Sequence, residues 1–122
     1  MQIQYAVFCE TIDFPKSSPV FKHPVTNLIT NDIAKLSDLE MPLLITFVNG
    51  TPGGHHLKIE IVTPAREITL PDFKFNWPPK KVSHGEIFTV KFQPDIFGLY
   101  TFRLIVDGEI MREIQIPIIQ EK

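Results

Sequence analysis

The stretch Phe97–Glu109, FGLYTFRLIVDGE, decides the fold that we expect of this chain. A glycine with a tyrosine two residues later opens a strand, which is the arrangement of a tyrosine corner in a two-sheet antiparallel fold. We expect the ring of Tyr100 to be buried and its hydroxyl to bond to backbone near the corner. Phe102, Leu104 and Val106 alternate with other residues after it, so this face of the strand should be buried as well.

A hairpin follows directly, because Asp107-Gly108 is a strong signal for a two-residue turn between antiparallel strands. The returning segment 109–119, EIMREIQIPII, again alternates. Its isoleucines predict one buried face, made of Ile110, Ile114, Ile116 and Ile118. Pro117 cannot donate to a ladder and indicates the edge of a sheet.

The middle of the chain repeats the same pattern of short strands and turns. Segment 43–49 reads as a strand buried on both sides, and Asn49-Gly50 is a strong turn signal. Segments 56–62 and 86–92 alternate cleanly, with Phe88, Val90 and Phe92 inward in the second of them. We expect further short strands at 66–70 and, along an edge, at 73–77.

The first forty residues are less regular. Segment 3–9 predicts a first strand with Tyr5, Val7 and Cys9 on one face. The three prolines of segment 11–24 predict a long loop or an irregular edge, and 25–30 is a candidate second strand. The one helical candidate is 31–40, where Ile33, Leu36 and Leu39 recur every three residues, Thr30 or Asn31 is available as a cap, and Pro42 prevents continuation.

These patterns predict an all-β protein with one domain over residues 1–122. Seven to eight short strands with at most one short helix favour two half-buried antiparallel sheets that cover one another. The corner at Tyr100 favours an immunoglobulin-like β-sandwich over a barrel.

Composition limits the function. Twelve Lys and Arg against fourteen Asp and Glu give a net charge of −2, which argues against binding to nucleic acid or to an anionic membrane. The first ten residues lack the features of a signal peptide, and no apolar run has the length of a membrane span, so we expect a soluble cytoplasmic protein. The one cysteine, Cys9, suits a reducing compartment and a buried strand.

The blocks QYAVFCE, GGHHLKIEIVTP and FGLYTFRLIVDGE resemble a family of small uncharacterised bacterial proteins, each a single immunoglobulin-like β-sandwich domain. The family has no established activity, so the resemblance implies a bacterial source and a fold but no mechanism. The resemblance rests on Tyr5, Ala6, Cys9, Glu10, Gly54, His56, Gly98, Tyr100, Phe102, Asp107 and Gly108.

The histidines do not form a recognisable site. His55 and His56 are adjacent and should point to opposite faces of a strand, so they are poor ligands for one metal ion. His23 and His84 lie in other turn-like segments. No serine or cysteine stands in a catalytic motif, and no glycine-rich phosphate loop is present, so we expect no enzyme, no metal and no cofactor. An enzyme would need one pocket that gathers His55, His56, His84 or Cys9.

The segment 73–81, FKFNWPPKK, is the most interesting surface candidate. Its aromatic residues and lysines are typical of an anchor for a protein partner, or of a surface on which a sugar or a single-stranded nucleic acid stacks. The alternative is an edge strand that packs its three aromatic rings inward, with lysines and prolines protecting the edge. The candidate binding residues are Phe73, Phe75, Trp77, Lys80 and Lys81.

The last strand offers a second surface. Ile118 and Ile119 are consecutive, so one of them should point away from the core. This predicts self-association through the C-terminal strand, with a wrapped terminus as the alternative. Our leading hypothesis is a non-catalytic protein-interaction or structural module with an unidentified protein partner. A small-ligand or carbohydrate-binding module that uses the aromatic segment is the second hypothesis, and a hydrolase is the third.

Overall fold

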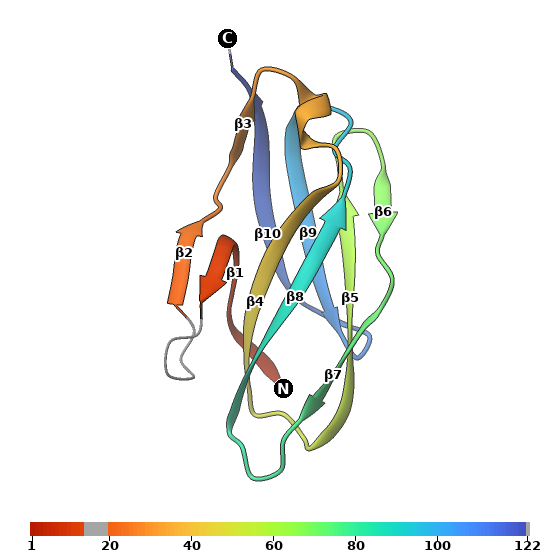
Figure 1. The fold of residues 1–122 in the computed structure, drawn as a ribbon. Helices are drawn as coiled ribbons and strands as arrows, with labels where there is room; N and C mark the ends of the chain where they lie inside the picture. The colour runs from red at the N-terminus through yellow and green to blue at the C-terminus, as the bar shows by residue number, and fades with distance from the viewer. Residues whose placement is uncertain (14–19, 122) are drawn as a thin grey trace.

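The structure is a computed structural model that describes residues 1–13 and 20–121, with the side chains of 1–10 and 24–121. Two sheets lie face to face, and neither is closed on itself (Figure 1). Their strand pairs are antiparallel, except for one parallel pair at the edge of the second sheet. The first sheet has the order β2 (Val20–Pro24), β1 (Gln2–Asp13), β4 (Leu39–Val48), β8 (Ser83–Phe92). The second has the order β3 (Leu28–Thr30), β10 (Glu109–Gln120), β9 (Gly98–Val106), β5 (Gly53–Val62), β6 (Glu67–Thr69), and β7 (Phe73–Trp77) also pairs with β5.

The predicted all-β class is confirmed, and the architecture is sandwich-like. The described residues form ten strands, where the sequence predicts seven or eight. The short strands β6 and β7 have counterparts among the predicted segments, whereas β2 lies in the stretch that was predicted as a loop or an irregular edge. β6 and β7 follow one another along the same side of β5, β7 opposite its first half and β6 opposite its second.

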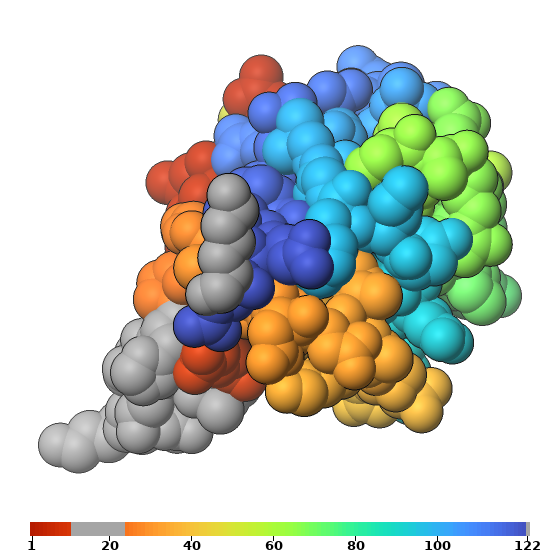
Figure 2. All heavy atoms as spheres, turned by 90° about the horizontal axis from the view of Figure 1, so that it is seen from above, coloured from red at the N-terminus to blue at the C-terminus, as the bar shows by residue number. Residues whose placement is uncertain are grey.

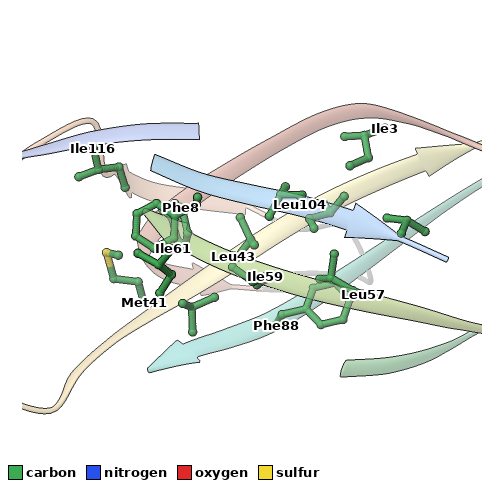
Figure 3. Packing of buried hydrophobic residues seen from close by; sticks show 14 of the residues in the cluster. Ile3, Phe8, Met41, Leu43, Leu57, Ile59, Ile61, Phe88, Leu104 and Ile116 are labelled. Carbon is green, nitrogen blue, oxygen red and sulfur yellow. The ribbon is translucent and has the colours of Figure 1, made fainter. Parts of the chain in front are cut away.

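Large apolar side chains from both sheets fill the space between the layers (Figure 3). The alternation read from the sequence produces this core, because every second residue of a strand faces the opposite sheet. Phe8 of the first sheet lies against Phe102 of the second, with ring centroids 4.9 Å apart. Fully buried positions also include the predicted inward residues of β9, namely Tyr100, Phe102, Leu104 and Val106.

The corner between β8 and β9 has the predicted geometry. The Tyr100 ring has no exposed surface, and its hydroxyl donates to the carbonyl oxygen of Ile96 at 2.7 Å. Gly98 approaches Pro64 so closely that a Cβ atom on it would lie 2.5 Å from the proline ring, and its φ is +141°. Both features require glycine at this position, since other residues rarely adopt that φ.

Two register shifts change which residues are buried. In β10 the pairing with β9 shifts between Ile110 and Arg112, so Ile110 is 58% exposed instead of lying with Ile116 and Ile118. In β1 a shift between Ile3 and Tyr5 turns Tyr5 outward. The prediction that Ile110 shares a buried face with Ile116 and Ile118 was wrong, because one extra residue in a strand moves its neighbours to the other face. The shift in β1 lies before Tyr5, so it separates Tyr5 from Ile3.

The region predicted as a loop is partly strand. β1 continues to Asp13 and pairs with β2, so much of the described part of 11–24 is an antiparallel hairpin at the edge of the first sheet. Of the two alternatives predicted for this stretch, the edge segment describes β2, and the long loop was wrong there because backbone pairing at an edge tolerates a poor sequence pattern. The remainder, 14–19, and the side chain of His23 lie outside the described residues.

The helical candidate is a single turn of 3-10 helix, Ile33–Leu36, instead of an α-helix. The spacing of three residues that indicated a helix is the period of the 3-10 form itself. Asp32 caps this turn by accepting from the amide of Ala34, so the predicted caps Thr30 and Asn31 were wrong. Within the described residues, no helix has the length and apolarity needed to span a membrane.

Candidate functional site

His55, His56 and His84 lie at the end of the molecule where the β4–β5 loop, β7, the start of β8 and the β9–β10 turn meet. β5 begins at Gly53, and alternation then turns His55 inward and His56 outward. The predicted divergence of these two side chains is confirmed: His55 is 7% exposed and His56 is exposed.

His55 makes a contact that sequence reasoning missed. Its Nδ1 lies 2.6 Å from a carboxylate oxygen of Asp107, and its Nε2 lies 2.7 Å from the carbonyl oxygen of Thr51. The other carboxylate oxygen of Asp107 accepts from the amide of His56 at 2.9 Å. The hydrogen bond with Asp107 raises the pKa of His55 above 6.5, although burial opposes this.

The pKa of Asp107 responds in the opposite sense. Burial alone raises it, but the hydrogen bonds from His55 and from the His56 amide, together with nearby positive charge, bring it below 3.8. The residue lies in the predicted Asp107-Gly108 turn, where φ is positive at both positions (49° and 85°). This is the backbone of a type I′ hairpin turn, so the turn prediction is confirmed.

A second histidine pairs with a carboxylate on β8. His84 and Glu86 are two residues apart and therefore on the same face of the strand, with Nε2 and Oε1 2.9 Å apart. The His84 ring lies 5.7 Å from that of Trp77 and 6.4 Å from that of Phe75. Phe75 thus lies between the rings of His84 and His55, the second at 5.5 Å.

The aromatic segment 73–77 packs inward. Phe75 and Trp77 are 5% and 2% exposed, and Phe73 is half-buried with its ring against Phe88. The Trp77 Nε1 donates to the carbonyl oxygen of Lys81 at 3.0 Å. The alternative of an edge strand with inward rings is therefore correct for Phe75 and Trp77. The prediction that these two residues form an exposed aromatic binding surface was wrong, because both are buried.

The lysines of this segment do face water. Lys80 and Lys81 are exposed in the β7–β8 loop, where Lys80 has a φ of 62°. Because the rings beside them point inward, the lysines do not combine with an aromatic surface. The structure therefore separates the five candidate residues of this segment into a buried pair, one half-buried ring and two solvated charges.

The histidine end has a shallow hollow of about 240 Å³, lined by Gly54, His55, His56, Lys74, Phe75 and Asn76. Among the described residues, no three His, Cys, Asp or Glu side chains are placed to hold a metal ion. His55 forms a pair with an aspartate, as a catalytic base does, but its second nitrogen faces a backbone carbonyl instead of a substrate site. Cys9 lines a different hollow, with Pro24 and Met41 among its neighbours.

Cys9 is buried as predicted, with no exposed surface. Burial raises the pKa of its thiol, which favours the unreactive protonated form. Among the described side chains, Cys9 lies in a different hollow from His55 and His56.

A second candidate lies on the outer face of the second sheet. Ile118 is buried and Ile119 is 43% exposed, so the prediction that one of the two points away is confirmed. Ile119 pairs with Ile29 of β3, which is 58% exposed, and Leu99 of β9, 47% exposed, pairs with Pro117. We call Ile29, Leu99, Pro117 and Ile119 the outer apolar patch. Figure 2 shows this end of the molecule, where the C-terminal part of β10 (dark blue) lies beside the segment around β3 (orange).

Sequence signals existed for part of what was missed. The pair of His84 and Glu86 could have been found by simple alternation, since the two residues share a face of the strand. Asp107 has no such signal, since it lies 52 residues from His55. The chain matches no model of a known protein family and no curated protein. The fold defines the chain as an all-β protein of two facing sheets.

Proposed function

We propose that this protein is a non-catalytic immunoglobulin-like module that binds a protein chain through the outer apolar patch, and that the chain it binds is a second copy of itself. The strand order supports the immunoglobulin-like assignment. In that fold one sheet contains strands A, B and E, and the other contains G, F and C, with C′ as an extension. The orders β1-β4-β8 and β10-β9-β5-β6 correspond to these two sets.

The corner at Tyr100 supports the same assignment, because a buried tyrosine bonded to backbone upstream is a hallmark of this fold at its E–F corner. The hairpin of β1 and β2 and the short β3 are additions before the second core strand. We include in this proposal the resemblance to the bacterial family and the cytoplasmic location, which are compatible with the buried thiol of Cys9.

The observation that carries the proposed function is the outer apolar patch. Ile29 and Ile119 are partners across a ladder, and so are Leu99 and Pro117, and these four side chains project from neighbouring strands on one face. Scattered exposed isoleucines are ordinary on a protein surface, whereas contiguous ones mark contact sites. No comparable grouping supports the aromatic segment as a ligand site, because Phe75 and Trp77 are buried.

The charges farther along the same outer face favour a second copy as the occupant of the patch. The same outer face continues through Arg103, which lies within 3.7 Å of Glu67 and 3.5 Å of Glu113. A face that carries both signs can meet its own two-fold copy with opposite charges aligned, and most homodimers use such an isologous contact. A standard interface covers about 800 Å² on each partner, with an apolar centre and a polar rim. In the proposed dimer the outer apolar patch is the centre, and the charged part of the same face belongs to the rim.

The non-catalytic part of the proposal rests on His55. A base needs a free nitrogen that reaches the proton it removes. The Nε2 of His55 is instead bonded to the Thr51 carbonyl, and the side chain is almost fully buried.

Sedimentation velocity over a wide range of protein concentration tests the proposal. We expect the sedimentation coefficient of the wild-type protein to rise with concentration, and that of Ile119→Glu to stay at the value of the monomer. Ile110→Glu is the matched control, since Ile110 is an exposed isoleucine of the same strand outside the patch. A wild-type protein that stays monomeric throughout, or an equal loss of association in Ile110→Glu, would overturn the proposed second copy.

A further inference from the structure

Both ring nitrogens of His55 face hydrogen-bond acceptors. Nε2 lies 2.7 Å from the carbonyl oxygen of Thr51, which can only accept, so Nε2 must carry a proton. A neutral imidazole has one N–H, and Nδ1 would then turn a lone pair toward the carboxylate of Asp107 at 2.6 Å. Only the doubly protonated imidazolium donates to both acceptors. The two hydrogen bonds can therefore form together only when His55 carries a positive charge.

The surroundings of the ring favour that charge. The Phe75 ring lies beside it, with centroids 5.5 Å apart and an angle of 26° between the planes, and an aromatic face attracts a cation. The amino terminus is close enough to disfavour the charge, but its effect is the smallest among the contributions at this ring. On the elements around His55, the ionisable groups nearest to it in sequence or register are His56 on β5, Lys74 on β7, His84 and Glu86 on β8, and Glu109 after the turn.

The imidazolium joins three separate segments. Thr51 belongs to the β4–β5 loop, His55 to β5, and Asp107 to the β9–β10 turn. Asp107 is bound to β5 by its backbone as well, since its amide donates to the carbonyl oxygen of His56 at 3.0 Å. The β4–β5 loop is held at its start by the Asn49 amide, which donates to the carbonyl oxygen of Val82 at 3.0 Å. The Thr51 carbonyl bonds to His55, so this later part of the loop depends on the charged ring.

We propose that His55 is a protonation-dependent clamp, which in its imidazolium form holds the β4–β5 loop and the β9–β10 turn against β5 and which releases the loop when the proton is lost. A neutral ring keeps one of its two hydrogen bonds and faces repulsion at the other acceptor. The ring must then rotate or the loop must move away. The consequence is a conformational change confined to the histidine end of the molecule, with the core between the sheets unchanged.

The pH range in which the clamp is closed follows from the pKa shifts of His55 and Asp107. The pKa of His55 is raised above 6.5 on folding, so its contribution to stability is complete below 6.5 and is lost as the pH rises through the folded value. The pKa of Asp107 is lowered below 3.8, so its contribution is present above 3.8 and is lost as the pH falls through the folded value. The clamp is therefore closed between pH 3.8 and 6.5, and it opens as the pH rises through the folded pKa of His55.

NMR titration of the histidine rings tests the clamp directly. In the wild-type protein we expect the His55 ring to titrate above 6.5 and the backbone amide shifts of the β4–β5 loop to move with the same midpoint. In Asp107→Asn the His55 midpoint should fall. A His55 midpoint at or below 6.5, or loop amides that do not follow it, would overturn the proposal.

The pH dependence of unfolding is the second measurement, with His84→Gln as the matched control. Raising the pH through the His55 midpoint should reduce the unfolding stability of the wild-type protein, by about tenfold in the equilibrium constant for each unit of pKa shift. His55→Gln should lose this dependence, whereas His84→Gln should keep it. If His55→Gln does not fold, the titration of the wild-type protein still decides the matter. An unchanged pH profile in folded His55→Gln would contradict the clamp.

Discussion

Replacing Trp77 by alanine is the sharpest test of the packing at the histidine end. The indole is 2% exposed, its Nε1 donates to the Lys81 carbonyl, and its ring lies against Gly50 so closely that a Cβ on that residue would overlap it. An aromatic side chain buries about 150–250 Å², which at about 25 cal/mol per Å² corresponds to about 4–6 kcal/mol. The retained alanine and partial collapse reduce this, and we expect a loss of about 3–5 kcal/mol in the free energy of unfolding.

That loss is large for a chain of this size. A stability of about 0.05–0.15 kcal/mol per residue gives roughly 6–18 kcal/mol in total. With an unfolding entropy of about 2.1 cal/mol/K per residue, the loss lowers the melting temperature by roughly 12–20 °C. Because Trp77 is the one tryptophan of the chain, its removal also removes the usual fluorescence signal. Urea unfolding should therefore be followed by far-UV circular dichroism in both proteins.

Lys81→Ala is the control, since it removes an exposed side chain from the same loop and keeps the carbonyl that Trp77 binds. We expect it to change stability by less than about 0.5 kcal/mol. The fluorescence of the wild-type protein offers an independent check, because a buried indole emits at shorter wavelength and is shielded from acrylamide. A loss below about 1 kcal/mol in Trp77→Ala, or strong acrylamide quenching of the native protein, would refute the burial of this ring.

Two further substitutions test the corner between β8 and β9. Tyr100→Phe keeps the ring and removes the hydrogen bond to Ile96, so urea unfolding should show a loss of about 1–2 kcal/mol, and an unchanged stability would contradict the corner. Gly98→Ala should reduce the free energy of unfolding by about 1–3 kcal/mol and lower the melting temperature, because it forces a side chain into Pro64 at a positive φ. Gly85→Ala, where a Cβ meets open space, is its control, and equal effects at the two glycines would refute the argument.

The long strands were predictable because burial on one face leaves a period of two in the sequence. β9 and β8 obey this pattern over most of their length, and their inward residues were identified correctly. The pattern fails where a strand contains an extra residue. Nothing in the residue types at Met111 or Gln4 indicates a bulge, and yet the shifts beside them decide that Ile110 and Tyr5 face water.

The aromatic segment shows a different limit. Alternation in 73–77 places three rings on one face, but it does not say which face meets the opposite sheet. The pairing of β7 with the first half of β5 decides that, because it sets Phe75 opposite His55 and Trp77 opposite Gly53. Binding residues and core residues have the same spacing in an edge strand, so only the neighbouring strand separates the two interpretations.

The histidine end depends on the same kind of information. His55 could be placed inward from its own strand, and Asp107 could be placed in a tight turn from Asp107-Gly108 alone. Their contact follows only once β5 and β9 are neighbours with Leu57 opposite Val106, because the next step of that antiparallel register brings His56 to Asp107. A motif at the start of one strand and a turn at the end of another then become a single ionic site. A search for metal or catalytic spacings along the sequence does not detect such a site, since its partners are related by register and not by distance along the chain.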